Sequence, residues 1–213
     1  MTISSRSINE PPANLKRGAK HYTGKASVLE RQPHIYEQVY PWIWQSTQVT
    51  TGDGESIRVP SGLKRMREQF ERAHKTGGSV WFIGNGGSAA IASHMAVDWT
   101  KNGGIRSRAM NDAPTLTCLA NDFGYDQVFA KGLEQHATKR DAVVIISTSG
   151  RLLNIVAASG VARTLGCFIA TLSGMNPNNV LRQRGDVNFY IPCVDYGIVE
   201  TAHLILLHSV IER

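Results

Sequence analysis

Residues 79–90 have the sequence SVWFIGNGGSAA, in which an apolar run passes directly into a glycine-rich turn. Because the run is continuously apolar rather than alternating, it predicts a strand buried on both faces of a sheet. The three glycines of the turn allow backbone amides to approach an anionic ligand, and Ser88 can cap the helix that follows. A tight strand-to-helix turn without a ligand would favour glycine as well.

Apolar runs and helical patterns alternate through the rest of the chain. Further apolar runs lie at 142–147, 167–173 and 187–192, with shorter apolar stretches near 105–109 and at 116–122. Helical patterns long enough to act as crossovers separate these runs, at 88–101, 125–137, 152–165 and 197–212, with a short one near 177–183. The alternation predicts an α/β fold: a single doubly wound, mostly parallel five-stranded sheet flanked by helices.

The N-terminal part of the chain does not follow this alternation. Residues 1–32 are rich in Ser, Pro, Gly and basic side chains and predict a basic arm outside the folded domain. Residues 33–77 predict helices, one of them interrupted by Pro41 and one capped by Ser61, with a loop at 50–56 between them. We therefore expect one domain over 33–213, whose sheet core occupies 78–213.

Composition and charge narrow the class of protein. The chain of 213 residues has a formal charge of +6, and its first 31 residues carry six basic side chains against two acidic ones. The arm lacks the interleaved aromatics and regular spacing of nucleic-acid-binding segments, so we expect it to be solvated and nucleic acid not to be a partner. Three widely spaced cysteines suit a reducing compartment, and no apolar run approaches the length of a membrane span. These features predict a soluble cytoplasmic protein.

A second candidate anion site follows the run at 142–147. Ser147, Thr148 and Ser149 precede Gly150 at the end of a predicted strand, so three hydroxyls and the backbone amides can form a cradle that needs no lysine. The alternative is an ordinary turn with Ser149 as a helix cap. No lysine follows either loop in the pattern of a nucleotide-binding P-loop, and no dinucleotide fingerprint is present. A phosphomonoester is therefore the favoured ligand.

Four stretches of the chain, in order, resemble a known family. They are GNGGSAA (84–90), LTCLANDFGYDQVF (116–129), ISTSG (146–150) and VETAHLILLH (199–208). The chain thereby resembles the sugar isomerase (SIS) domain family over roughly residues 60–213. Within that family it resembles the phosphoheptose isomerases, which interconvert sedoheptulose 7-phosphate and D-glycero-D-manno-heptose 7-phosphate.

The resemblance implies a set of functional residues and an assembly. The positions that bind the phosphosugar in the family are here Asn85, Gly86, Gly87, Ser88, Asn111, Asp112, Ser147, Thr148, Ser149 and Glu200. The positions that bind a metal ion, usually zinc, are here His94, Asp98, Glu200 and His208. The resemblance also implies one Zn²⁺ per subunit and a homotetramer with shared active sites.

The residue spacing fits this metal set. His94 and Asp98 are four residues apart on one predicted helix, and Glu200 and His208 are eight apart on another, so each pair shares a helix face. Two imidazoles and two carboxylates suit tetrahedral zinc. The chain departs from the family at Asp98, where Glu is usual, and at Glu200, where Gln is usual. It also has Arg151 and Leu152 where Asn and Ser usually follow the serine loop.

The leading hypothesis is an aldose–ketose isomerase that works through an enediol, with Asp98 and His208 transferring the proton. Two alternatives remain open: a SIS-domain regulator or adaptor that binds a phosphosugar without catalysis, and an isomerase for another phosphosugar. His203 points away from His208 around the helix, which predicts a structural or interfacial role. His136, at a predicted helix end, is expected at the surface.

Overall fold

The fold is built on one seven-stranded sheet in a computed structural model that describes residues 35–211. The predicted arm at 1–32 therefore lies outside the described residues. The strand order is β2-β1-β7-β6-β5-β3-β4, and the strands are β1 (Gln48–Thr51), β2 (Ser56–Ile57), β3 (Val80–Gly84), β4 (Ser107–Ala109), β5 (Ala142–Ser147), β6 (Phe168–Gly174) and β7 (Val187–Ile191). From β7 to β4 all neighbours are parallel, which confirms the predicted mostly parallel sheet with five parallel strands.

The other two strands were not predicted. β1 pairs antiparallel with β7, and β2 pairs antiparallel with β1, so a small hairpin extends the sheet to seven strands. Its connection corresponds to the loop predicted at 50–56. Strands of four and two residues are too short to give a periodic signal in the sequence, which explains why they were missed.

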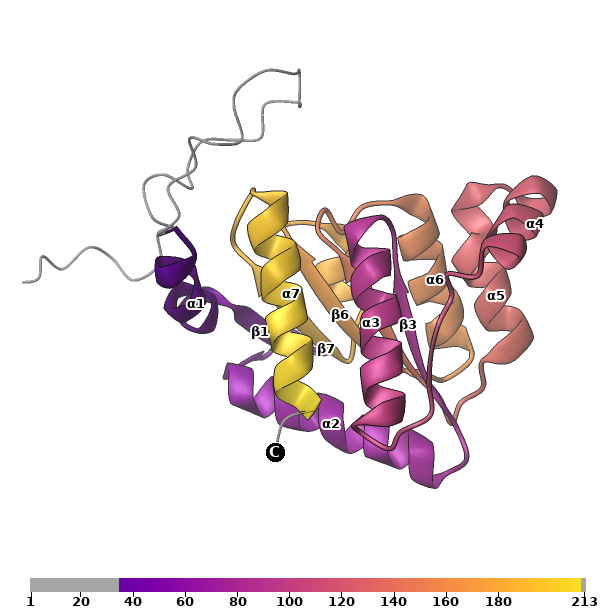
Figure 1. Cartoon of the computed structure of the whole chain (residues 1–213), viewed down its shortest axis with the longest axis horizontal. Coiled ribbons are helices and arrows are strands. Elements are labelled where there is room, and N and C mark those ends of the chain that lie inside the picture. Colours follow the sequence, from indigo (N-terminus) through magenta and orange to yellow (C-terminus); the bar gives the residue numbers. More distant parts are fainter. Residues whose placement is uncertain (1–34, 212–213) are drawn as a thin grey trace, which may run out of the picture.

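Helices cover both faces of the sheet (Figure 1). One face carries α1 (Ile35–Ser46), α2 (Val59–Lys75), α3 (Gly87–Lys101) and α7 (Tyr196–Ile211). The other carries α4 (Ala113–Phe123), α5 (Val128–His136) and α6 (Leu153–Thr164). Two short 3-10 helices complete the described chain, η3 (Tyr125–Gln127) and η4 (Val180–Gln183). The predicted doubly wound α/β architecture is confirmed.

The central strands contribute alternately to two hydrophobic cores. Phe82 and Val144 pack on the side of α2, α3 and α7, whereas Ile83 and Ile145 pack on the side of α5 and α6. All four side chains are fully buried. Burial on both faces explains why these strands are continuous apolar runs in the sequence. Among residues 35–211, no helix combines the length and hydropathy of a membrane span.

Two local expectations were wrong at helix starts. The apolar stretch at 116–122 forms part of α4, because Asp112 caps that helix by accepting a hydrogen bond from the backbone N–H of Thr115, and Pro114 lies in its first turn. The second helix begins at Val59 rather than after Ser61, with Pro60 in its first turn. In both places a proline favours the helical start.

The topology identifies where a ligand would bind. β3 connects to β4 on one side, whereas the next strand, β5, pairs with β3 on the other side. The connections that follow β3 and β4 thus lead to opposite sides of β3, which makes this a topological switch point. Ligands of open α/β sheets bind at the carboxyl ends of the strands at such a point. The loops that follow β3 and β5 are the two predicted anion sites, so the fold brings them together.

Candidate functional site

The loop after β3 has a backbone that requires glycine. Gly86 has φ of +56°, and a Cβ at Gly84 would lie 2.6 Å from the backbone of Ser88. α3 begins at Gly87, and no side chain caps it, so the prediction that Ser88 is the cap was wrong. Ser88 is instead buried inside the first turn. The N–H groups of Ser88 and Ala89 bond to Asn85 O and Gly86 O, so the amides of the exposed Gly86 and Gly87 are the ones that favour an anion at this position.

The loop after β5 carries three hydroxyl groups, and one of them shapes the turn. Ser147 Oγ accepts a hydrogen bond of 3.2 Å from the backbone N–H of Gly150 and so shapes the turn. Within residues 35–211, the hydroxyls of Thr148 and Ser149 make no hydrogen bond, and α6 has no side-chain cap at its start. The alternative of Ser149 as a helix cap is therefore wrong. Ser149 is half-buried and open to a ligand, whereas Thr148 is 7% exposed, so a ligand would have to reach into the turn to meet its hydroxyl.

Asn111 and Asp112, predicted to contact the sugar, both have partners in the protein. The Asn111 side-chain amide donates to Ala89 O and Ser93 Oγ, each at 2.7 Å, which fixes it against α3. Asp112 accepts hydrogen bonds from the N–H and hydroxyl of Thr115. These bonds, that from the hydroxyl first, lower the pKa of Asp112 below its ordinary value. A ligand would meet an oriented Asn111 and an ionised Asp112.

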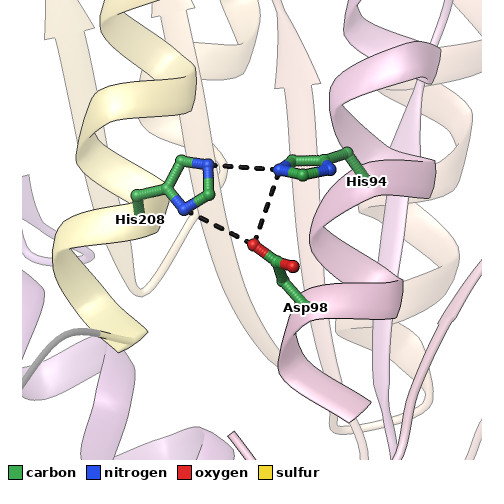
Figure 2. Close-up of side chains that lie close together, drawn as sticks. All are labelled: His94, Asp98 and His208. Atoms are coloured by element: carbon green, nitrogen blue, oxygen red, sulfur yellow. Dashed lines mark hydrogen bonds and ion pairs between the residues drawn. The ribbon is translucent and has the colours of Figure 1, made fainter. Parts of the chain in front are cut away.

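Three of the four predicted metal ligands converge between α3 and α7 (Figure 2). His94 Nε2 lies 3.2 Å from His208 Nε2, and Asp98 Oδ2 lies 3.5 Å from both His94 Nε2 and His208 Nδ1. The side chain of Asp98 is 20% exposed, and the two histidines are more open. Asn102 also donates to Asp98 Oδ1 at 3.4 Å. We refer to His94, Asp98 and His208 as the triad.

The donor set of the triad fits a zinc ion. Zinc prefers imidazole nitrogen and carboxylate oxygen at about 2.0–2.1 Å in tetrahedral geometry, in which neighbouring ligand atoms are roughly 3.4 Å apart. Two separations are close to that value, 3.2 Å from His94 Nε2 to His208 Nε2 and 3.5 Å from His94 Nε2 to Asp98 Oδ2. His208 meets Asp98 through its other ring nitrogen, and with one ligand atom taken from each residue the three lie within 4.8 Å of one another. Asn102 supplies the outer hydrogen bond that orients a ligating carboxylate. Three protein ligands would leave the fourth position for substrate or water.

Glu200, the fourth predicted ligand, lies elsewhere along α7. Its carboxylate lies beside Gly87, where a Cβ would come within 2.6 Å of its atoms. It is eight residues from His208, a rise of about 12 Å along a helix. Burial raises the pKa of Glu200. The structure thus groups Glu200 with the loop after β3 rather than with the triad.

The remaining two histidines noted in the sequence have structural surroundings. His203 is fully buried under the sheet, and its Nε2 lies 3.2 Å from Ser173 O. His136 is exposed at the end of α5, as expected, and its ring stacks on Trp81 at a centroid distance of 6.1 Å. Neither lies in the triad, and the expectation that His203 faces away from His208 agrees with its burial.

His203 should make the stability of the protein depend on pH. Burial lowers its pKa from 6.5 to about 4, so the folded state resists a proton that the unfolded chain accepts. The free energy of unfolding is therefore unaffected by this group above pH 6.5. It falls as the pH decreases from 6.5 toward 4, by about 3 kcal/mol in total. Urea unfolding at pH 7 and pH 5 should show a smaller decrease for His203→Gln than for the natural chain. Equal decreases would contradict this assignment.

Comparison with known proteins agrees with the geometry. A family model described as SIS domain matches residues 60–174, which is more than half of the chain. The chain belongs to the SIS domain family. The phosphoheptose isomerase of Aliarcobacter butzleri is 33% identical over 161 residues, covering 70% of this chain and 85% of that protein. The phosphoheptose isomerase of Helicobacter hepaticus is 35% identical over 152 residues, covering 68% and 77%.

A solved structure supports the same placement within the SIS family. Phosphoheptose isomerase from Neisseria gonorrhoeae superposes with a TM-score of 0.66 at 27% identity, over 72% of this chain and 85% of that chain. Together with the curated relatives, this places the chain among the phosphoheptose isomerases, and it is an isomerase of that family. The family model covers the triad residues of α3 and the loops after β3 and β5.

Sequence reasoning missed the residues that support the two loops. Tyr125 and Asn154 form hydrogen bonds with Asn85, and Asn179 packs under Gly150. Tyr125 lies within the motif at 116–129 and Asn154 shortly follows the motif at 146–150, whereas Asn179 is distant from every quoted motif. A single sequence does not show which polar residues face inward. Asn154 could have been noticed because it is the one polar residue in the apolar pattern LLNIVAA at 152–158.

Proposed function

We propose that this protein converts sedoheptulose 7-phosphate to D-glycero-D-manno-heptose 7-phosphate. The observation that carries the proposal is the convergence of His94 and Asp98 from α3 with His208 from α7, on the helix that begins at the loop after β3. Phosphosugar binding alone would require the loop but not a solvent-accessible cluster of two imidazoles and a carboxylate. The cluster therefore favours catalysis over a regulator that only binds a phosphosugar.

The phosphate is assigned to the two loops. Backbone amides of Gly86 and Gly87 and the hydroxyls of Thr148 and Ser149 are assigned as donors without a lysine. The N–H of Ser88 bonds to Asn85 O at 3.0 Å and shapes the loop. Asn85 and Asn111 are assigned to the sugar hydroxyls, with Asp112 and Glu200 at the edges of the same region. Ser147 shapes the second loop through its bond to Gly150.

The distance between loop and triad suits a seven-carbon chain. Gly87 and His94 are seven residues apart on α3, a rise of about 10 Å. An extended chain of seven carbons spans about 8 Å at ~1.5 Å per bond, and the phosphate adds to it. A heptose anchored by its phosphate would therefore present its C1 and C2 atoms to the triad.

Isomerisation requires a proton to move from C1 to C2 of the sugar. We assign Asp98 as the base that removes the C1 proton to give the enediol and returns a proton at C2. His208 is assigned to the proton movement between the two oxygens, which suits an imidazole near neutral pH. A bound zinc ion would polarise the sugar oxygens and stabilise the charge of the enediolate. His94, Asp98 and His208 would hold it, one ion per subunit.

The assembly and location follow from the family likeness. We propose a homotetramer whose active sites are shared between subunits, acting in the cytoplasm as a single domain over residues 33–213. Large apolar side chains near the candidate site are exposed in the single chain: Val97, Phe123, Tyr125, Leu153 and Tyr196. Val97 lies between His94 and Asp98 on α3 and is 62% exposed, so a second subunit could cover the triad's surroundings.

The test is to incubate the purified protein with sedoheptulose 7-phosphate and follow the aldose product by NMR. We expect turnover with zinc, loss of turnover after treatment with a chelator, and recovery when zinc is restored. Tight binding of the sugar phosphate without product, with and without zinc, would contradict the proposal and favour a regulator. If the protein isomerised another sugar phosphate but not sedoheptulose 7-phosphate, the proposed substrate would be wrong and the proposed reaction type would stand.

A further inference from the structure

Asn85, the first residue after Gly84 in the loop, is held by two side chains from other elements. Asn85 Nδ2 donates to Asn154 Oδ1 at 3.0 Å, and Asn154 Nδ2 donates to Asn85 Oδ1 at 3.1 Å. The hydroxyl of Tyr125, on η3, donates to the same Asn85 Oδ1 at 2.8 Å. Asn154 belongs to the first turn of α6, directly after the loop of Ser147–Gly150. We refer to Asn85, Asn154 and Tyr125 as the amide clamp.

Asn154 and Asn85 differ in burial, and therefore in whether they can contact a ligand. Asn154 is 2% exposed, so it has no surface to offer a sugar phosphate. Asn85 is half-buried and lies beside the exposed Gly86 and Gly87 at the start of α3. Asn154 therefore acts on a ligand only through Asn85.

The hydrogen-bond count determines what Asn85 presents to a ligand. A side-chain carbonyl oxygen has two lone pairs, and both on Asn85 Oδ1 are used by Asn154 and Tyr125. The amide nitrogen has two N–H groups, and one is used by Asn154. One N–H donor therefore remains, and the orientation of the amide is fixed. A donor suits the oxygens of a phosphorylated sugar, whereas an amide free to rotate would present its carbonyl oxygen to them as well.

We propose that Asn154 and Tyr125 are positioning residues for the phosphosugar site. They orient the free N–H of Asn85 toward the substrate and join the loop after β3 to the start of α6, so that the two anion-binding loops act as one site. This inference rests on the proposed function and adds two residues to it. Neither Asn154 nor Tyr125 is assigned any contact with substrate.

The test compares binding and turnover in Asn154→Ala and Tyr125→Phe with the natural protein. We expect the Kd for sedoheptulose 7-phosphate, measured by calorimetry, to rise about 10-fold in Asn154→Ala and about 3-fold in Tyr125→Phe, as expected for lost hydrogen bonds. KM should rise in parallel, whereas kcat should change less than 3-fold because the triad is untouched. Asn154→Asp, whose carboxylate accepts from Asn85 but cannot donate to it, should fall between Asn154→Ala and the natural protein.

Ser159→Ala is the matched control. Ser159 is buried on the same helix, six residues after Leu153, the first residue of α6. Within residues 35–211 its hydroxyl donates only to Val156 O, at 2.6 Å. It should change thermal stability without changing Kd. If Asn154→Ala does not fold, Tyr125→Phe decides, because it removes one hydroxyl from a side chain that is 57% exposed.

The outcomes separate this inference from the proposed function. Calorimetry requires no turnover, so the clamp is tested even if the protein does not isomerise the sugar. A natural protein that turns over substrate, with Asn154→Ala and Tyr125→Phe both unchanged in Kd and KM, would overturn the clamp and leave the function intact. An equal rise in Kd for Ser159→Ala would overturn it too, because the effect would then reflect helix stability.

Discussion

Replacing His208 by alanine is expected to lower kcat for the isomerisation of sedoheptulose 7-phosphate by at least about 100-fold, the usual contribution of a positioned acid or base. His208 is the single triad residue from α7, and its two ring nitrogens face His94 and Asp98 at 3.2 and 3.5 Å. Its loss removes a proton-transfer group and one of three candidate zinc ligands together. The variant should fold normally, since the side chain is 36% exposed.

The measurement combines kinetics with metal content. Zinc per subunit, determined after dialysis, should fall in His208→Ala along with kcat, whereas the Kd for the sugar phosphate should change little because the phosphate-binding loops are unaltered. His136→Ala is the control, because His136 is also exposed near a helix end but stacks on Trp81 away from the triad. Full activity in His208→Ala, or an equal loss of activity in His136→Ala, would contradict a catalytic role for the triad.

The core of the fold was predictable because local signals and burial agree. The runs at 142–147 and 187–192 are apolar at almost every position, and the structure buries every residue of both strands. The hairpin of β1 and β2 has no comparable apolar run. Its place in the sheet depends on pairing with β7, more than 130 residues away, which a local pattern does not show. The stretch at 116–122 is apolar but begins after Asp112 and Pro114, and these helix-start residues outweighed the apolar run.

The part of the candidate site that lies on a single helix could be predicted from the spacing of its residues in the sequence. His94 and Asp98 share a face of α3 because they are four residues apart, and that expectation was correct. Glu200 and His208 also share a side of α7, but two helical turns are too long for both to reach one ion with His94. The amide clamp depends on contacts between β3, η3 and α6, and such distant pairs are not visible in one sequence.

Replacing Gly150 by alanine is expected to raise the Kd for sedoheptulose 7-phosphate by about 100-fold, because two separate constraints act on that residue. Its φ of +61° is unfavourable for any residue with a Cβ, by roughly 1–2 kcal/mol. A Cβ there would also overlap the side chain of Asn179. Asn179 cannot easily move, because it is buried and bonds to Gly174 O, Asn176 O and Arg182 N.

The overlap should displace the loop that carries Thr148 and Ser149, and with it the phosphate-binding hydroxyls. Gly54→Ala isolates the backbone effect, since Gly54 has a similar φ of +85° but no atom within 4 Å of an added Cβ. It should lower the free energy of unfolding by about 1 kcal/mol without changing sugar phosphate binding. If Gly150→Ala instead bound the sugar phosphate as tightly as Gly54→Ala does, the loop after β5 would not be the phosphate site, because its shape could not then matter to the ligand.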